Sequence, residues 1–284
     1  MRWRALPLLA ALLLLQPASG AAAPVRRPVA AELMECGFYN EQLFRSAIAA
    51  AQPYEIPPPL IGIVPHHDVA GVLAASLLVT AAGREIDTVV LIGPNHGGQG
   101  AAMATTRKAV STPQGRLLCD VDAVERLLAL PGLTVADELL RRDHSVQALL
   151  PLVAHTFPKA EIVTLLLSRT AEPGALSALA AELAALTREK SCLILGSIDF
   201  SHGLQPADAA VRDAETAALI AAGDVAALAA LGNEHLDAPA VLSTLLQLAG
   251  RCDRQLTLLQ RADAAEFVAP PWPDGVTGYM IYGG

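Results

Sequence analysis

Short apolar segments alternate with amphipathic segments along most of this chain, and this alternation limits the fold more than any other feature. Each apolar segment ends at a proline, a glycine or a polar residue, as do strands that are buried on both faces of a sheet. The clearest are residues 59–64, 87–94, 160–168 and 192–197. Helical periodicity between them indicates βαβ units. We therefore predict a single three-layer α/β domain over residues 24–284, with a mostly parallel central sheet and helices on both faces.

Residues 1–23 have the composition of a cleavable export signal. The cationic start "MRWR" precedes the apolar run "ALPLLAALLLL", and the small residues of "QPASGAAA" follow it. The run is too short to be a stable membrane anchor, and no later apolar stretch is long enough to span a bilayer. The sequence therefore predicts an exported protein, periplasmic or secreted, without stable membrane insertion.

The chain carries a formal net charge of −8, and removal of residues 1–23 with their two arginines would lower it by two, to −10. A negative surface repels the phosphate backbone of nucleic acids. We therefore expect no nucleic-acid partner.

Four cysteines are present, but none forms a C-x-x-C pair, so a zinc knuckle or a thioredoxin-type site is not indicated. They are Cys36, Cys119, Cys192 and Cys252. Export would permit disulfides, although the spacing selects no pairing. Cys192 lies in an apolar run that is typical of a buried strand.

Histidines follow three of the predicted strands at the point where each strand ends. His66 and His67 come after the first, His96 after the second and His202 after the last. Because ligands of open α/β sheets bind beyond the carboxyl ends of the strands, we expect these imidazoles to meet at one edge.

Two further positions have the right chemistry for this edge. His144 lies at a predicted helix N-terminus, where the helix dipole favours a neutral ring that can bind metal or accept a proton. The alternative is a surface histidine beside a capping Asp143 or Ser145. Asp199 follows the last of these strands and could orient a histidine or hold a water, or only cap a turn. His155, by contrast, has no convergent partners and is predicted to be structural.

The loop "GNEHLDAPAV" offers a possible completion of a metal site. Its polar residues Glu234, His235 and Asp237 precede a predicted helix. In the alternative interpretation this is a polar loop in which Asp237 caps the helix and Pro239 occupies its first turn. That alternative explains Asp237 better than it explains His235.

Motifs of several other mechanisms are absent from the sequence. There is no G-x-S-x-G, no Walker A motif and no G-x-G-x-x-G after a strand. A Cys–His pair stays possible, but no cysteine follows a strand in the manner of a nucleophile.

Seven short motifs occur in an order that resembles the Memo family, whose bacterial members are called AmmeMemoRadiSam system protein B. They are "CGFYNEQLF", "VPHHD", "LIGPNHGG", "TPQG", "DHSVQALLPLV", "SIDFSHG" and "DAPA". The resemblance extends from about residue 27 to the C-terminus. It implies the fold of the LigB-like class III extradiol dioxygenases, non-haem iron(II) enzymes that open catechol rings with O2.

The resemblance also implies roles for individual residues. His66 and His96 correspond to two metal ligands of the family, and His202 corresponds to the acid/base residue of the dioxygenases. His144 and Asp199 would act beside it in the catalytic pocket. The remaining pocket positions are His67, Asn95, Asp143 and Glu234.

The third metal ligand is where this chain departs from the family, which usually has a cysteine. An alignment on Pro239 places His235 there and gives a three-histidine site, whereas a shift by one residue offers Glu234 and a two-histidine, one-carboxylate site. We predict His235 as the ligand. The expected cofactor is one divalent metal, iron(II) in the first place, with copper and zinc as alternatives.

Three functions are compatible with such a site. The first is a metal-dependent oxidoreductase of the extradiol-dioxygenase type that acts on an unidentified small molecule. The second is a non-catalytic metal-binding adaptor with a protein partner, and the third is a zinc-dependent hydrolase. Since only 4% of the residues are aromatic, an aromatic-lined catechol pocket is not evident from the sequence.

Overall fold

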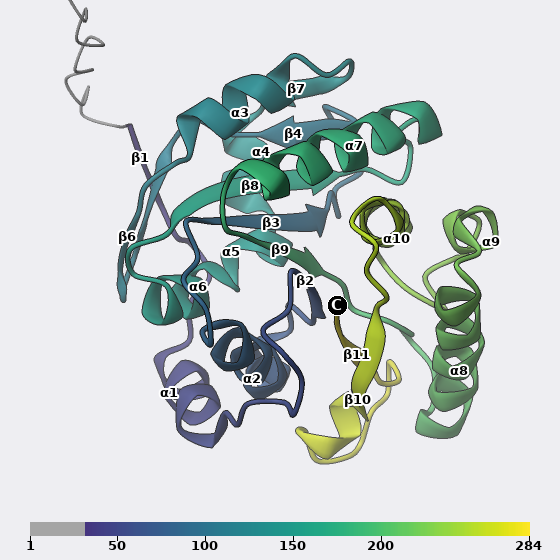
Figure 1. Cartoon of the computed structure of the whole chain (residues 1–284). Helices are drawn as coiled ribbons and strands as arrows, with labels where there is room; N and C mark the ends of the chain where they lie inside the picture. Colours follow the sequence, from purple (N-terminus) through teal and green to yellow (C-terminus); the bar gives the residue numbers. More distant parts are fainter. Residues whose placement is uncertain (1–31) are drawn as a thin grey trace, which may run out of the picture. The chain divides into compact units, whose positions relative to one another are not determined.

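The apolar segments of the sequence become four parallel strands at the centre of an eight-stranded sheet (Figure 1). In spatial order they are β2 (Ile61–Val64), β9 (Cys192–Ser197), β3 (Thr88–Pro94) and β8 (Glu161–Leu167). The structure is a computed structural model and describes residues 32–284. The predicted export signal lies outside the described residues.

Antiparallel strands extend this parallel centre on both sides. Beside β2 lie β11 (Gly278–Gly283) and then β10 (Thr257–Asp263), each antiparallel to its neighbour. Beside β8 lies the antiparallel β4 (Met103–Thr105), followed by β7 (Leu133–Val135), which is parallel to β4. Four of the seven pairings are parallel, so the predicted mostly parallel sheet is confirmed.

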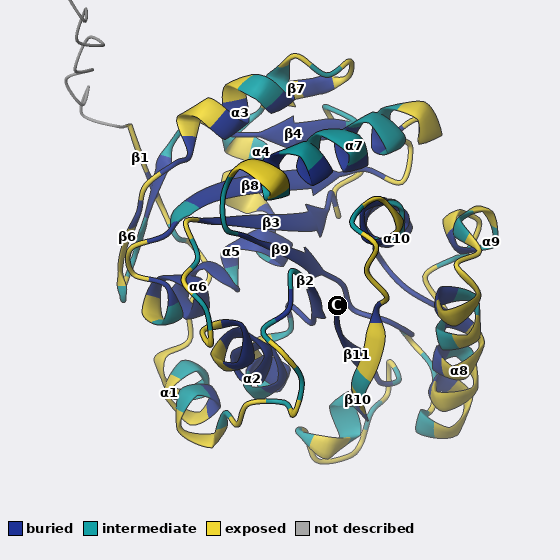
Figure 2. Ribbon diagram, in the orientation of Figure 1, coloured by how far each residue is buried: buried dark blue, intermediate teal, exposed yellow. Residues whose placement is uncertain are grey.

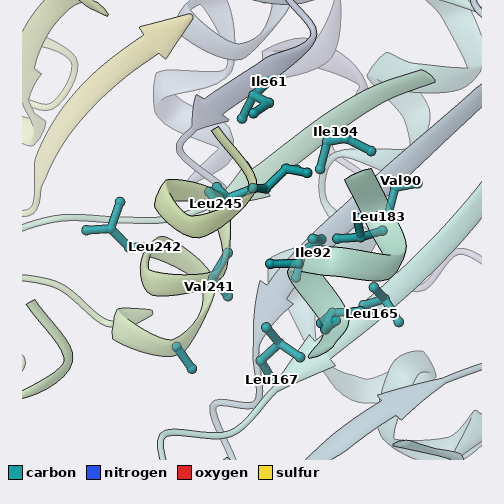
Figure 3. Close-up of a cluster of buried hydrophobic side chains, with 14 of the residues drawn as sticks. Ile61, Val90, Ile92, Leu165, Leu167, Leu183, Ile194, Val241, Leu242 and Leu245 are labelled. Atoms are coloured by element: carbon teal, nitrogen blue, oxygen red, sulfur yellow. The ribbon is translucent and has the colours of Figure 1, made fainter. Parts of the chain in front are cut away.

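One face of the sheet packs against α3 (Val121–Leu128), α7 (Pro173–Glu189) and α10 (Pro239–Arg251). Alternate side chains of β3, Val90 and Ile92, point into this layer and are fully buried (Figure 3). Leucines of α7 and α10 meet them, as expected for helices with one apolar face.

The other face packs against α2 (Gly71–Ala81) and α6 (Leu150–Thr156), and α1 (Glu41–Ala50) lies outside α2. The intervening residues of β3, Val89 and Leu91, belong to this second cluster. Because successive side chains of a strand point to opposite faces, both faces of the central strands are covered and the three-layer prediction is confirmed. Figure 2 shows the central strands buried, except at Glu161, the first residue of β8.

The sequence predicts two helix starts at an aspartate, Asp68 near the N-cap of a helix that ends at about residue 82 and Asp120 as the cap of the helix that follows it, and the two had different outcomes. Asp120 caps α3 as predicted, since its side chain accepts a hydrogen bond from the backbone N–H of Ala123. Asp68 does not cap α2: it is the first residue of a 3-10 turn, Asp68–Ala70, that leads into that helix. The position before the turn belongs to His67, whose side chain makes no capping bond.

A predicted single helix after Asp143 is two helices, α5 (His144–Gln147) and α6. Pro151 has no backbone N–H, so the carbonyl of Gln147 cannot receive its usual helical bond. Cys36 Sγ lies 3.3 Å from that carbonyl oxygen and donates to it instead.

The elements that the sequence did not indicate are short. They include the strands β1 (Leu33–Glu35) and β5 (Ala109–Thr112) and the helices α4 (Asp137–Arg142) and α9 (Val225–Ala229). Strands β1 and β5 form a three-stranded sheet with β6 (Gly115–Leu117), which occupies the position of a short strand that the sequence predicts after the turn at residues 112–115. The long α8 (Pro206–Ala222) was predicted, and it exposes much of its surface (Figure 2).

All four cysteines are free thiols, and Cys192 is buried in β9 as predicted. Within residues 32–284, no helix combines the length and the apolar character that a membrane span requires.

Candidate metal centre

Three histidines from distant parts of the sequence meet at the carboxyl edge of the sheet. His66 follows β2, His96 follows β3 and His144 begins α5, and one ring nitrogen from each lies within 4.8 Å of the others. The rings of His96 and His144 stack with centroids 4.4 Å apart, and the His66 ring is 5.1 Å from each. The structure thus brings together two predicted metal ligands and one residue that was predicted to be catalytic.

The approach of α5 to this edge depends on Gly93 near the end of β3. A Cβ atom at this position would overlap Ser145 Oγ and crowd its Cβ at 2.9 Å. Ser145 Oγ in turn donates to the carbonyl oxygen of Pro94 at 3.1 Å. Glycine therefore lets α5 lie close enough to place His144 beside the strand ends.

We expect Gly93→Ala to lower the free energy of unfolding by about 1–3 kcal/mol, because the backbone must shift to admit the methyl group. Urea denaturation measures the change. Gly174→Ala is the matched control, since a Cβ there meets nothing within 4 Å and should cost no stability. Equal stability of Gly93→Ala and the wild type would show that the close approach is not required.

Hydrogen bonds fix the tautomer of His66. Its Nδ1 lies 3.0 Å from Ser197 Oγ, and that hydroxyl donates its own proton to the carbonyl oxygen of Ser145 at 2.6 Å. Ser197 must therefore accept a hydrogen bond from Nδ1–H, which leaves a lone pair on Nε2. Burial, which outweighs the attraction of Asp199, lowers the pKa of His66 to about 3, so the ring is neutral at pH 7.

Asp143 orients His96. Its Oδ1 lies 2.9 Å from His96 Nδ1, and its Oδ2 accepts the backbone N–H of His96 at 2.8 Å. Burial would raise the pKa of Asp143, but the bonds from His96 and the amide of Ser145 outweigh it and lower the pKa to about 2. Burial would likewise lower the pKa of His96, but Asp143 and Asp237 outweigh it and raise that pKa to about 10.

Asp237 lies between the two rings. Its Oδ2 is 3.2 Å from His66 Nε2 and 3.3 Å from His96 Nε2, and its side chain is only 5% exposed. Asp199 and Asp237 hold each other in place: the Asp199 amide donates to Asp237 Oδ1 at 3.2 Å, and the Asp237 amide donates to the Asp199 carbonyl at 3.1 Å. Burial raises the pKa of Asp237.

A divalent cation suits this arrangement. Asp237 Oδ2 is buried between the two rings, and the lone pair of His66 Nε2 faces it at 3.2 Å. A carboxylate oxygen and a ring lone pair at this distance need a positive charge near both, which the proton on His96 supplies in the metal-free protein and a bound cation would supply in its place. Imidazole and carboxylate are also donors that divalent transition metals bind. The residues present therefore fit a metal.

His235 and Glu234, the two predicted candidates for the third ligand, lie elsewhere. His235 Nε2 is 3.0 Å from Glu215 Oε2 of α8, and its Nδ1 is 3.4 Å from Glu234 Oε1. The amides of His235 and Leu236 both bond to the carbonyl of Gly232, so the chain turns and directs His235 toward α8. The structure thus places Asp237, and not His235 or Glu234, beside the histidine pair.

The same geometry corrects the interpretation of Asp237 as a helix cap. The residue that precedes α10 is Ala238, and no side chain caps the helix. The carboxylate of Asp237 instead faces His66 and His96, so the loop does reach the metal-binding histidines, but through Asp237.

His67, Asp199 and His202 form the adjoining part of the site. His67 Nδ1 lies 3.1 Å from Tyr279 Oη and 3.2 Å from Asp199 Oδ2, while Asp199 Oδ1 accepts the backbone N–H of His66 at 3.1 Å. The His202 ring is 6.5 Å from that of His67, and its buried Nδ1 has no bonding partner in the described part of the chain. Burial lowers the pKa of His202, so this ring too is neutral.

An aromatic cavity of about 430 Å³ opens beside the histidines. His66, His67 and His144 form its polar end. Its other walls include Phe38, Tyr39, Leu43, Phe44, Pro151 and Leu152. The cavity was not predicted because the overall aromatic content is low, but three of its rings come from the short segment 38–44. His155 lies behind this wall, with its ring edge-on to Phe44 at 5.7 Å.

A polar cavity of about 200 Å³ lies on the side of His96 and Asp237. Asn95 and Arg169 are among its lining residues. Asn95 was predicted as a pocket residue from its place beside His96. Arg169 was not predicted, and neither were Ser197 and Tyr279, although Ser197 lies within the motif "GSIDFSHG".

Comparisons with known proteins agree with this architecture. A family model described as Memo-like protein matches residues 40–239. A MEMO1 family protein of Pyrobaculum arsenaticum is 31% identical over 148 residues, which are 50% of this chain and 52% of that protein. One of Methanococcus vannielii is 28% identical over 185 residues, 60% of this chain and 63% of that protein. The chain thus spans between half and two thirds of the length of these curated relatives.

A solved structure shows a related fold. The crystal structure of the uncharacterized protein JW3007 from Escherichia coli K12 superposes with a TM-score of 0.52 at 13% sequence identity, over 79% of this chain and 99% of that one. Likeness at this identity concerns the fold and not the activity.

Proposed function

Since the chain belongs to the Memo-like protein family, we propose that it is a metal-dependent oxidoreductase in which His66, His96 and Asp237 hold one divalent metal. The observation that carries this proposal is the position of Asp237 Oδ2, 3.2 and 3.3 Å from the Nε2 atoms of the two histidines. Two imidazoles and one carboxylate are the ligands of non-haem iron(II) oxygenases, which leave positions open for other ligands. Iron(II) is therefore the metal that we propose first.

Residues of the chain would then bind the substrate, exclude water and accept a proton. Bound iron(II) would bring substrate and O2 together at one centre. The aromatic cavity would hold an apolar substrate against the histidines and exclude water from them. His202 and His67 would accept a substrate proton, since Asp199 lies 3.2 Å from His67 Nδ1 and would stabilise the charged ring.

A zinc-dependent hydrolase is the second candidate. It is favoured by the group of three ring nitrogens, from His66, His96 and His144, within 4.8 Å of one another. Three histidines with an open fourth position are the ligands of a known class of catalytic zinc site. In a non-catalytic adaptor, by contrast, His202 would have no chemical task.

Metal analysis of protein purified without oxygen separates these candidates. The proposal expects about one iron per chain in the wild type, together with oxygen uptake when aromatic hydroxyl compounds are supplied. His202→Ala should keep the iron and lose the uptake, and His155→Ala should keep both. Stoichiometric zinc with no oxygen dependence would favour the hydrolase, and a protein that binds no metal would refute both enzymes.

Metal affinity is expected to rise with pH. Before metal binds, the pKa of His96 is raised to about 10, so the metal must displace the proton on its Nε2. Each released proton makes the apparent affinity rise by about tenfold per pH unit below the pKa of the group that loses it. Competition with a chelating dye at pH 6, 7 and 8 and constant ionic strength measures the slope. A pH-independent affinity would contradict this account of His96.

We also propose that the protein is exported. The support is the cationic, apolar and small-residue pattern of residues 1–23. Intact-mass analysis of the protein from the native host and from a variant without residues 2–23 tests it. An unprocessed N-terminus in the native host would contradict a cleaved signal.

A further inference from the structure

Arg169, which follows β8, is a fixed positive charge without a close anionic partner. Its guanidinium donates to the carbonyl of Leu231 at 2.9 Å, to Asn233 Oδ1 at 2.7 Å and to the carbonyl of Leu236 at 2.5 Å. All three acceptors are neutral, and within residues 32–284 no carboxylate lies at ion-pair distance from it. The side chain is thus held in place while its charge stays available to a ligand.

This charge borders the polar cavity on the same side as the metal ligands. The cavity of about 200 Å³ is lined by Arg169, by His96 and Asp237, and by the first residues of α10. α10 has 13 residues and no side-chain cap, so the partial positive charge of its first N–H groups adds to that of Arg169. Two independent sources of positive potential therefore lie at one small cavity.

Asn95 contributes the opposite hydrogen-bonding character. It is 6% exposed and lines the same cavity, and its Nδ2 donates to the carbonyl of Gln99 at 2.9 Å. This bond fixes the orientation of the side-chain amide and identifies the other atom as the oxygen, Oδ1. Asn95 Oδ1 is a buried acceptor that has no hydrogen-bond partner among the described residues. Buried acceptors are normally paired, which points to a ligand with an O–H or N–H group.

We propose that the polar cavity is a subsite for a carboxylate of the substrate, with a neighbouring hydroxyl that donates to Asn95 Oδ1. The proposal rests on the proposed function for the place of the substrate beside His96 and Asp237. Arg169 Nη2 already donates twice, to Asn233 Oδ1 and to the carbonyl of Leu236, so a carboxylate would receive single charge-assisted hydrogen bonds from Nε or from the second hydrogen of Nη1. A phosphate dianion suits the cavity less well, because Asn95 Oδ1 and Asp237 are both acceptors. No lysine or arginine of the described residues lines the aromatic cavity, so a charged group is directed to the polar one.

Calorimetric titration of the metal-loaded protein with glycolate and with glycolamide, its uncharged analogue, tests the subsite. The wild type should bind glycolate at least about tenfold more tightly than glycolamide, since hydrogen bonds between ions are the stronger ones. Arg169→Gln should bring this ratio close to one. A merely structural role of Arg169 would weaken both ligands alike and leave the ratio unchanged, and that result would overturn the proposal.

Arg84→Gln is the matched control. Like Arg169, Arg84 donates only to neutral acceptors, which are Ser191 Oγ and the carbonyls of Pro59 and Cys192. These acceptors lie at the amino end of β9, away from the polar cavity. This variant should lose thermal stability and keep the glycolate ratio.

Two further arms separate the alternatives. Inorganic phosphate that binds more tightly than glycolate, with the same dependence on Arg169, would overturn the assignment to a carboxylate. Glycolate bound equally by the metal-loaded wild type and by Arg169→Gln would be a ligand of the metal alone, so the subsite would fail while the metal site stands. Metal-free protein is titrated with iron(II) in parallel. Absence of iron binding in that titration would refute the proposed function, and this result does not depend on the glycolate ratio.

Discussion

Replacement of Asp237 by asparagine is expected to lower the affinity for the metal on the order of a hundredfold or more, because a charged ligand is lost from between two imidazoles. The substitution preserves the shape of the side chain. Asn Oδ1 can still accept the backbone N–H of Asp199, which lies 3.2 Å from Asp237 Oδ1. The effect should therefore be confined to the metal.

The metal-free variant should be about as stable as the metal-free wild type. An asparagine Nδ2 in place of Asp237 Oδ2 would donate to the lone pair of His66 Nε2, 3.2 Å away, but the carboxylate's interaction with the protonated His96 Nε2 at 3.3 Å would be lost. Thermal melting with and without added iron(II) measures the contribution of the metal. The wild type should gain stability from iron(II), whereas Asp237→Asn should gain little.

His235→Ala is the decisive comparison, since the sequence favoured this residue as the ligand. His235 Nε2 is 3.0 Å from Glu215 Oε2, so its loss should leave metal affinity within about twofold of the wild type, well under a tenfold effect. Loss of metal from His235→Ala, together with retention in Asp237→Asn, would reverse the assignment made here.

The main layers of the fold follow from the sequence because they are long and strongly patterned. The helix Pro173–Glu189 and the seven-residue strand Thr88–Pro94 occupy the predicted positions. Strand β1 has only three residues, too few to show an apolar period, and its partner β5 lies far away in the sequence. Pairing of this kind is decided by tertiary contacts and not by local propensity.

The candidate site was predictable where its residues follow strands. His66 and His96 could be placed together because β2 and β3 both end at one edge of the sheet. Asp237 could not, since "LDAP" is also the pattern of a capped helix start with proline in its first turn. Its two hydrogen bonds with Asp199, one from its own amide and one to its side chain, decide its orientation, and they exist only in the folded chain.

The position of His235, away from the histidine pair, has a specific geometric cause. The alignment on Pro239 assumes that the loop before it follows the same path as in the family. Here the chain turns at Gly232, whose carbonyl oxygen accepts hydrogen bonds from two consecutive amides. His235 and Asp237 are two residues apart and face different partners, α8 in one case and the histidine pair in the other.

Asp143→Asn is expected to weaken metal binding by about 10–100-fold without unfolding the site, because it removes the charge that orients His96. Asp143 Oδ1 lies 2.9 Å from His96 Nδ1 and also accepts the Ser145 amide at 3.0 Å as the cap of α5. Asparagine caps helices about as well as aspartate. The helix should therefore persist while His96 loses the carboxylate that favours its Nδ1–H form, in which Nε2 faces Asp237.

Asp120→Asn is the matched control for this variant. Asp120 is also a buried helix cap, whose Oδ1 accepts the Ala123 amide at 3.0 Å, but it lies in α3, outside the group of metal-binding side chains. Dye competition at pH 7 should show wild-type affinity for Asp120→Asn and a clear loss for Asp143→Asn. Equal affinities in the two variants would mean that Asp143 serves α5 alone and that His96 needs no carboxylate behind it.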